Sequence, residues 1–271
     1  MEKYISRQPA RMKQRNGGTA FGDGIRMAQA LGAAITGTDR FYGHVLSKDA
    51  LTNDMLWPYP YLDSLVTAGI VVNQDGKRYT DEGRGGVSVA NAVATLDDPL
   101  SSTCVFDQTI WEGPGRNGLI AANPHLVKEN ATIFEAADLD ALAAKAGLNA
   151  AKLKDTIAAY NAALTARADA TTFTPADGIP RRSQKYKAMP IVNAPYYAVP
   201  MVSGITYTMG GIVINTHAQA LREDGSVIEG LYAAGAATGG LEGGPQIGYV
   251  GGLAKSGITG LAAAEHIAAV G

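Results

Sequence analysis

A glycine-rich stretch near the C-terminus constrains the fold most: residues 230–260, GLYAAGAATGGLEGGPQIGYVGGLAKSGITG. Eleven of its 31 residues are glycine, a composition from which a plain apolar core gains nothing. Because glycine has no Cβ, a flat ring or a phosphate can lie directly on its backbone. The pattern predicts a strand ending in AAG, a glycine-rich loop, and a helix whose first turn is GGLAKSG. Free N–H groups at such a helix start favour an electron-rich ligand, although a tight packing joint uses the same residues.

Composition narrows the classes of protein that fit. Of the 271 residues, 46% are hydrophobic and 18% are charged, which permits a substantial buried core. The formal net charge of −2 gives no electrostatic case for nucleic acid or an anionic membrane, and no apolar run reaches the ~18 residues of a membrane span. The single cysteine, Cys104, excludes an internal disulfide and a cysteine-based metal cage, and it is expected to be a buried thiol. We expect a soluble, cytoplasmic protein without a metal site.

The two ends of the chain, residues 1–40 and 196–271, have the pattern of α/β structure. Residues 19–34 place apolar side chains at helical spacing after a glycine-rich entry. From residue 196 onward, strand-like segments alternate with turns, and residues 252–269 are typical of a helix built from small residues. The first twenty residues are basic and show no strand pattern.

The middle of the chain, residues 41–195, predicts an α+β insertion. Its first part, 41–63, is rich in aromatics and proline and shows neither a helical nor an alternating pattern. Residues 69–80, GIVVNQDGKRYT, predict a hairpin with an Asp-Gly turn, and residues 102–107 predict a strand. Residues 130–168 are alanine-rich and predict two helices, the first ending at a glycine. The predicted fold class is therefore α/β with an α+β insertion.

Several motifs together resemble one family, that of the succinate dehydrogenase/fumarate reductase flavoproteins. They are GDGIRMAQALGA, GIVVNQDGKRYTDEG, and the C-terminal series YTMGGIVIN, GLYAAGAATGG and YVGGLAKSG. The family includes fumarate reductases, tricarballylate dehydrogenase and 3-ketosteroid dehydrogenases. The resemblance implies an FAD domain formed by residues 1–40 and 196–271, interrupted by a capping domain at 41–195, with substrate held between the cap and the flavin.

One expected element of that family is missing from the sequence. The family opens with a strand–GxGxxG–helix unit whose helix start binds the FAD pyrophosphate, and no such unit occurs here. We therefore expect either a fragment or a chain whose adenine-binding half comes from another polypeptide, an N-terminal FAD-binding fragment or subunit. Alone, the chain is expected to bind FAD poorly. If part of the FAD domain is missing, apolar surface beside the capping domain would be exposed, so self-association of the chain is also expected.

The resemblance implies a set of cofactor-binding residues in three motifs. Peptide N–H groups at the start of the last helix would stabilise negative charge on the reduced flavin ring. Many relatives carry an acidic residue after AAG, where this chain has alanine. The implied cofactor residues are Asp23, Gly235, Ala236, Gly252, Leu253 and Ala254.

For the substrate, the resemblance implies a histidine contact at His44, and ordinary loop hydrogen bonding is the alternative. The fumarate reductase pattern has a histidine before TMGG and an arginine before the second glycine pair, where this chain has Tyr207 and Tyr249. The proton-donating arginine of that pattern corresponds to Gly86, with Arg84 two residues early. Two cationic contacts with a dicarboxylate would thus be lost.

The tyrosine in GYVGG instead resembles the tyrosine–glycine arrangement of the ketosteroid dehydrogenases, which adds Gly251 as a substrate contact. In those enzymes tyrosine hydroxyls act on a ring ketone and transfer a proton. We predict Tyr249, Tyr207 and Arg84 as catalytic residues, although a tyrosine packed under the sheet is the alternative for Tyr207.

The sequence thus predicts an FAD-dependent oxidoreductase, or its C-terminal half. It would add or remove hydrogen across a C–C bond next to a carbonyl, with a ketone or ketosteroid-like substrate favoured. One alternative is a fumarate- or tricarballylate-type enzyme that uses His44 and Arg84 as anion contacts. The other is a truncated, non-enzymatic remnant that needs a partner chain.

Overall fold

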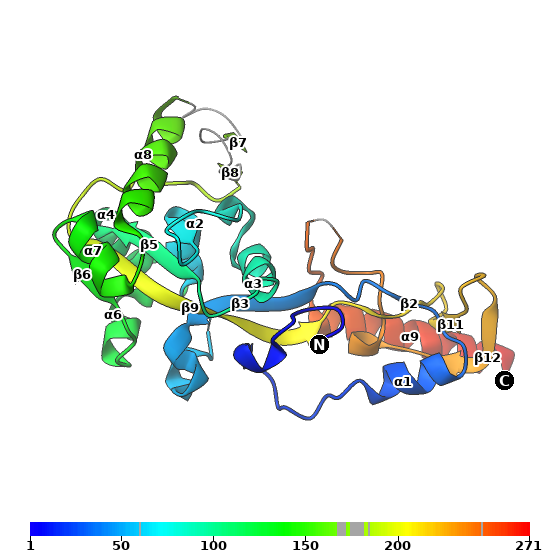
Figure 1. Ribbon diagram of the computed structural model, residues 1–271. Helices are drawn as coiled ribbons and strands as arrows, with labels where there is room; N and C mark the ends of the chain where they lie inside the picture. The colour runs from blue at the N-terminus through cyan, green and yellow to red at the C-terminus, as the bar shows by residue number, and fades with distance from the viewer. Residues whose placement is uncertain (60, 167–171, 174–181, 184, 245) are drawn as a thin grey trace. The chain divides into compact units, whose positions relative to one another are not determined.

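A 13-residue strand, β9 (Tyr196–Thr208), organises the main sheet of the computed structural model (Figure 1). Among the described residues this sheet has six strands, and the five others are β1, β3, β4, β5 and β6. β5 (Thr103–Asp107) and β6 (Phe134–Ala136) both pair antiparallel with β9, and β4 (Ile70–Val72) pairs antiparallel with β5. β3 (Phe41–Ser47) and β1 (Lys13–Gln14) also pair with β9. Residues of β9 are mostly buried, as expected for a strand with partners along both edges.

The structure describes residues 1–59, 61–166, 172–173, 182–183, 185–244 and 246–271. The chain divides into two compact units. Unit 1 consists of residues 1–5, 16–42 and 205–271, and unit 2 consists of residues 6–15 and 43–204. Among the helices within the described ranges, none combines the length and the hydropathy that crossing a membrane requires.

Unit 2 contains the sheet and most of the helices. Its core is formed by fully buried residues on the sheet and the helices beside it, among them Leu65, Val71, Val105, Phe106 and Leu126. Cys104 is also fully buried, as predicted, and burial raises the pKa of its thiol. The α-helices are α2 (Asp63–Ala68), α3 (Gly86–Ala94), α4 (Gln108–Glu112), α5 (Pro114–Asn117), α6 (Ala122–Lys128), α7 (Leu139–Ala146) and α8 (Ala150–Ala166). Short strands β7 (Thr172–Phe173) and β8 (Arg182–Ser183) pair with each other, and the 3₁₀ turns are η1 (Pro9–Arg11), η2 (Lys48–Leu51), η3 (Asp54–Leu56) and η4 (Glu82–Arg84).

Unit 1 has a smaller core, built from Ala28, Ala33, Ile212, Ala220, Ile228 and Ala233. Two short antiparallel pairs supply its strands, β2 (Ile35–Thr36) with β10 (Gly211–Ile212) and β11 (Gln219–Leu221) with β12 (Val227–Tyr232). Its helical elements are α1 (Asp23–Ala30), η5 (Gly235–Ala237) and α9 (Gly252–Val270).

Most predicted elements are present, and two expectations were wrong. The predicted hairpin turns at residues 73–77, where the Asn73 N–H donates to the Lys77 carbonyl, and the α7 helix ends at Gly147 in the left-handed conformation. The segment 41–63 is not patternless: β3 buries Phe41, Gly43 and Val45 and leaves the two residues between them half-buried. A buried glycine among aromatic neighbours concealed this alternation. The first twenty residues also contain a strand, the two-residue β1.

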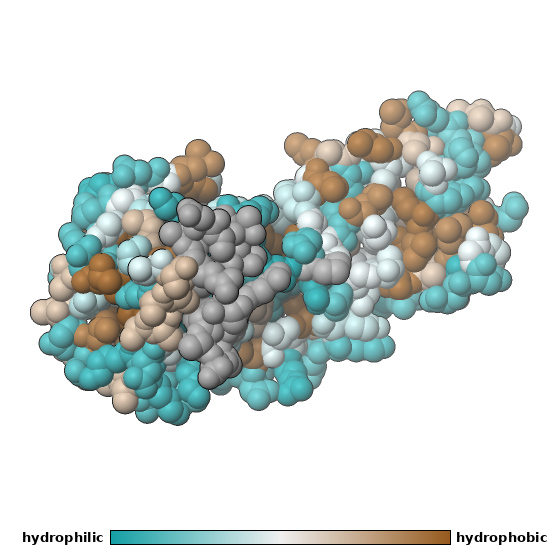
Figure 2. Space-filling model, turned by 90° about the horizontal axis from the view of Figure 1, so that it is seen from above, coloured by the Kyte–Doolittle hydropathy of each residue, from teal (hydrophilic) through white to brown (hydrophobic). Residues whose placement is uncertain are grey.

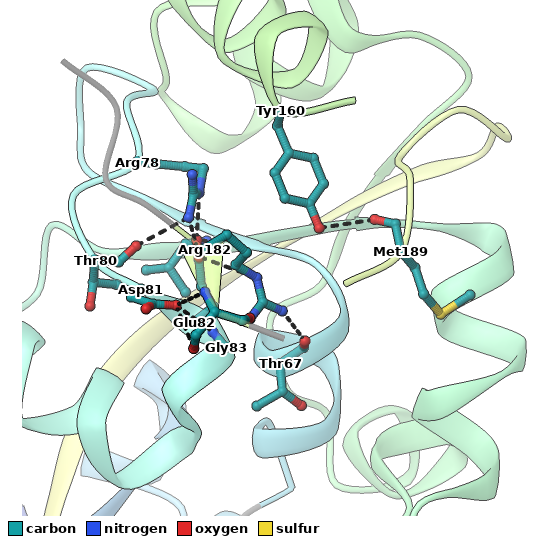
Figure 3. Close-up of polar contacts among 11 residues, drawn as sticks. Thr67, Arg78, Thr80, Asp81, Glu82, Gly83, Tyr160, Arg182 and Met189 are labelled. Atoms are coloured by element: carbon teal, nitrogen blue, oxygen red, sulfur yellow. Dashed lines mark hydrogen bonds and ion pairs between the residues drawn. The ribbon is translucent and has the colours of Figure 1, made fainter. Parts of the chain in front are cut away.

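A buried charge cluster joins β8 to the hairpin in unit 2 (Figure 3). The side chains of Arg78, Glu82 and Arg182 have no exposed surface. Glu82 accepts hydrogen bonds from Arg78 at 2.5 and 2.9 Å and from the Val71 N–H at 2.9 Å. Arg182 donates to the carbonyl oxygens of Thr67 and Ser183, and its Nε lies 3.7 Å from Glu82. One carboxylate therefore compensates two guanidinium groups in the interior.

Replacing this carboxylate is expected to be costly. The variant Glu82→Gln keeps the shape of the side chain but leaves two buried cations without their anion, which should lower the free energy of unfolding by about 3–5 kcal/mol. Urea denaturation followed by circular dichroism measures the change. The control is Glu112→Gln, which breaks a half-exposed pair with Arg116 and should leave the unfolding curve close to that of the wild type. Equal unfolding curves for the two variants would contradict the structural role of the cluster.

Candidate functional site

The glycine-rich loop and the start of α9 bring five predicted cofactor residues onto two adjacent elements of unit 1. The Gly235 N–H, at the start of η5, donates to Thr259 Oγ1 of α9 at 2.9 Å. A Cβ at position 235 would lie 2.8 Å from Ser256 Oγ, so η5 can approach α9 this closely because residue 235 is glycine. Ala236 follows on η5, and Gly252, Leu253 and Ala254 form the first turn of α9.

The start of α9 presents free backbone donors. Its first helical hydrogen bond joins the Lys255 N–H to the Gly251 carbonyl, so the N–H groups of residues 252–254 have no partner within the helix. The Gly252 N–H donates to the hydroxyl oxygen of Tyr249 at 3.0 Å. Leu253 and Ala254 are exposed, the side chain of Leu253 almost completely. These donors and the open backbone around them fit the electron-rich edge of a flavin ring.

The sixth predicted cofactor residue, Asp23, has different neighbours. It is the first residue of α1, its side chain is 70% exposed, and it forms an ion pair with Arg26. The described contacts do not join it to η5 or to α9.

Three tyrosines of unit 1 form a ring cluster that includes both predicted catalytic tyrosines. Tyr249 stacks on Tyr42 with ring centroids 3.9 Å apart. The ring of Tyr207, at the end of β9, lies 5.8 Å from that of Tyr42 and 6.3 Å from that of Tyr249. Sequence reasoning missed Tyr42, whose position on a strand could have been found only by recognising β3.

The two predicted catalytic tyrosines use their hydroxyl groups in opposite ways. The Tyr207 hydroxyl lies 3.0 and 2.9 Å from the two carboxylate oxygens of Glu242, to which it donates. Burial, together with the hydrogen bond to this carboxylate and its negative charge, raises the pKa of Tyr207 well above its usual value. The Tyr249 oxygen instead accepts from the Gly252 N–H, which leaves its own proton available for another acceptor.

Unit 2 contains His44 and Arg84, and a pocket of about 380 Å³ lies beside the aspartate that contacts His44. His44, on β3, lies with its Nδ1 2.6 Å from Asp63 Oδ2. Asp63 starts α2 and lines the pocket together with Gly86, Tyr186 and four further residues: Ser64, Thr67, Leu119 and Ile120. Asp63 Oδ1 and Ser64 Oγ are buried polar atoms without a hydrogen-bond partner among the described residues. Sequence reasoning missed Asp63, because an aspartate at a helix start is typical of a simple cap.

Gly86 lies directly against the carboxylate of Asp63. A Cβ at position 86 would be 2.0 Å from Asp63 Oδ1, so a side chain at this position requires Asp63 to move. Arg84 precedes it on η4 and is half-buried. The segment with Arg84 and Gly86 is thus linked to His44 through Asp63. In unit 1, Gly251 has φ +101° and is the residue before the first turn of α9.

Comparisons with known proteins identify the family. A family model for an FAD binding domain matches residues 7–248. The chain is 31% identical over 241 residues to an NADH:acrylate oxidoreductase of Vibrio harveyi, covering 88% of this chain and 22% of that protein. It is 29% identical to a 3-oxosteroid 1-dehydrogenase of Mycobacterium tuberculosis, covering 91% of this chain and 46% of that protein. The solved structure of an open flavocytochrome c3 fumarate reductase matches 97% of this chain and 42% of that chain, with 25% identity and a TM-score of 0.57.

The chain thus spans between about a fifth and a half of the length of these relatives. The family match includes the GDGIRMAQALGA, GIVVNQDGKRYTDEG, YTMGGIVIN and GLYAAGAATGG motifs, and it ends just before YVGGLAKSG. FAD is the cofactor that the family match indicates. The chain belongs to the FAD-binding domain family of flavoprotein oxidoreductases whose members include fumarate reductases and 3-ketosteroid dehydrogenases.

Proposed function

We propose that this chain is part of an FAD-dependent oxidoreductase that acts on a C–C bond next to a ketone carbonyl. The observation that carries the proposal is the pair of tyrosine hydroxyls in one ring cluster, one committed as a donor to Glu242 and the other free to donate. Removal of hydrogen next to a ketone needs two protein groups. One must polarise the carbonyl, and the other must take a proton.

FAD, when bound, supplies the hydride chemistry. The residues proposed to hold it are those named from the sequence, with the backbone N–H groups of Leu253 and Ala254 facing the ring edge and η5 beside them. The exposed donors and the absence of side chains at Gly251 and Gly252 support this assignment. Asp23, on α1, remains a proposed cofactor contact.

Tyr249 is the proposed carbonyl donor. Its oxygen already accepts the Gly252 N–H, so its hydroxyl proton is available to a substrate acceptor, and the ring stacks on that of Tyr42. Tyr207 is the proposed proton acceptor, because its own proton is directed to Glu242 and its remaining lone pair is open to substrate. His44, Arg84 and Gly251 are proposed substrate contacts.

A carboxylate substrate is the second candidate, because relatives include an acrylate oxidoreductase and fumarate reductases. The lack of a cation at position 86 favours the ketone, because Gly86 stands where the fumarate reductase pattern has an arginine.

We propose that residues 1–40 and 196–271 are the FAD-domain segments and that residues 41–195 form the capping domain. We also propose a partner region that packs on α9, either an N-terminal FAD-binding fragment or subunit or a second copy of the chain. Hydrophobic side chains lie exposed over the part of the chain that includes α9, β11 and β12 (Figure 2). On α9 itself the exposed side chains are Leu253, Ile258, Leu261, Ile267 and Val270.

The first prediction concerns FAD. The isolated chain is expected to bind FAD weakly, so excess FAD should give a protein-bound flavin absorbance band at about 450 nm. Leu253→Pro removes one of the two free N–H donors in the first turn of α9, where proline is tolerated, and should weaken FAD binding by roughly 2- to 10-fold. Leu253→Ala keeps the N–H and should bind FAD more tightly than the proline variant does. Fluorescence titration measures both affinities. A chain that stays colourless in excess FAD would instead support the non-enzymatic, partner-dependent alternative.

The second prediction concerns the tyrosines. With FAD and an electron-accepting dye, the chain should oxidise 4-androstene-3,17-dione or a smaller cyclic ketone. Tyr207→Phe and Tyr249→Phe should each lower kcat by a factor of about 10²–10⁴, because each removes a proton-handling group. The control is Tyr232→Phe, whose hydroxyl contacts His266 rather than the ring cluster.

Fumarate with a reduced dye provides the opposing test. Rapid reduction of fumarate without ketone oxidation would overturn the ketone assignment and favour the carboxylate-type enzyme.

A further inference from the structure

A buried ion pair lies behind Tyr207 in unit 1. The side chains of Glu242 and Lys255 are 0% and 1% exposed, and Glu242 Oε2 lies 3.1 Å from Lys255 Nζ. Lys255 also donates to the Thr238 carbonyl at 2.9 Å, and the Val250 N–H donates to Glu242 Oε1 at 3.2 Å. With the hydroxyl of Tyr207, these contacts give the carboxylate three different donors.

Stability alone is a weak reason for such a pair. Removing a carboxylate and an ammonium from water costs several kcal/mol for each ion. A well-packed pair of apolar side chains in the same place often gives the fold equal or higher stability. The rest of α9 consists largely of alanine, glycine and aliphatic residues, and Lys255 is its one Lys or Arg residue. The lysine therefore has a specific effect on its surroundings: its ammonium group compensates and positions the neighbouring Glu242 carboxylate in the interior.

Tyr207 connects this pair with the ring cluster. It is half-buried, its ring lies beside those of Tyr42 and Tyr249, and its hydroxyl donates inward to Glu242. Because burial and the adjacent carboxylate raise the pKa of Tyr207, its hydroxyl does not lose a proton to solvent near neutral pH. The Tyr207 oxygen can instead take a proton from the substrate while it passes its own proton to Glu242.

We propose that Glu242 is the final proton acceptor of this site, receiving the proton through Tyr207, and that Lys255 is the positioning residue that holds the Glu242 carboxylate against the Tyr207 hydroxyl. The proposal rests on the ketone function proposed above. The C–H bond next to the substrate carbonyl breaks, and its proton forms a bond with the Tyr207 oxygen. The original Tyr207 O–H bond breaks, and that proton passes to a Glu242 oxygen.

The electron pair of the broken C–H bond becomes the C=C bond of an enolate. The negative charge moves to the carbonyl oxygen, where Tyr249 donates its hydrogen bond. Glu242 ends neutral beside the Lys255 ammonium, which retains its bond to the Thr238 carbonyl. No electron is gained or lost in this step, and its reversal returns the proton to carbon.

The step can be measured without hydride transfer, as exchange of the hydrogens next to the carbonyl for deuterium. The chain with FAD is incubated with 4-androstene-3,17-dione in D₂O, and exchange is followed by NMR. Glu242→Gln and Lys255→Met should each slow exchange by about 100-fold or more. Glu265→Gln, on the exposed side of α9, should leave it unchanged.

The double variant Glu242→Gln/Lys255→Met separates a proton role from a structural one. Replacing both charges removes the uncompensated buried ion that each single variant leaves, so the double variant should unfold at a urea concentration closer to that of the wild type. Its exchange should nevertheless stay slow. Recovery of wild-type exchange in the double variant, or fast exchange in Glu242→Gln, would overturn the proposal.

A second readout needs no substrate. NMR of chain labelled with ¹³C at tyrosine Cζ follows each hydroxyl through its titration, and Tyr207→Phe assigns the signal. Glu242→Gln should lower the pKa of Tyr207, because it removes the adjacent negative charge. An unchanged pKa would overturn the proposal even if ketone turnover is found. If the wild-type chain exchanges no hydrogen from the ketone, the ketone function fails and the proton role fails with it, while the titration still reports the Tyr207–Glu242 bond.

Discussion

Unit 1 depends on a close contact between backbone segments, at the place where three glycine-containing segments cross. A Cβ at Gly211 would lie 2.2 Å from the Ala237 carbonyl oxygen, and a Cβ at Gly210 would lie 2.6 Å from the backbone of Gly37. β10 pairs with β2 at this crossing, and Ile212 forms a bridge with Thr238. Any side chain here would force the three segments apart. Since β9 ends just before the crossing and η5 lies within it, the same contact fixes both Tyr207 and the loop beside α9.

The two units each bury charge, with different consequences. In unit 2, Glu82 is enclosed by two arginines and by backbone donors, and its contacts join β8 to the hairpin. In unit 1, Glu242 is also enclosed, but one of its donors is the hydroxyl of a half-buried tyrosine. A carboxylate whose donors are all interior can only stabilise the fold. A carboxylate reached through a hydroxyl can in addition exchange a proton with whatever that hydroxyl contacts.

The sequence was sufficient for features whose physical cause is local. A glycine-capped α7, the Asp-Gly hairpin and the helix after GG each follow from neighbouring residues, and each is present. The glycine motifs also led to the correct family and to FAD, because close backbone approach to a flat ring restricts residue choice strongly. The prediction failed where the pattern was interrupted, as in β3, whose buried glycine breaks the apolar alternation.

Sequence reasoning missed other site residues for a different reason: their partners are distant in sequence. Glu242 follows a leucine in a glycine-rich loop, where a carboxylate is typical of a solvent-exposed turn, and its partner Lys255 is 13 residues away. Asp63 resembles an ordinary helix start, although its carboxylate meets His44 and Gly86. Only the fold brings these groups together, so neither charge nor spacing distinguishes them beforehand.

At the start of α9, the tyrosine ring cluster and a cofactor can use different backbone N–H groups. A helix start offers several N–H groups without internal partners, and Tyr249 uses one of them, that of Gly252. The N–H groups of Leu253 and Ala254 remain at the exposed end of the helix. The donor that positions Tyr249 is therefore separate from the donors available to a flavin edge. Gly251, with φ +101°, makes this division possible, because its left-handed backbone turns the chain from the tyrosine into the helix within two residues.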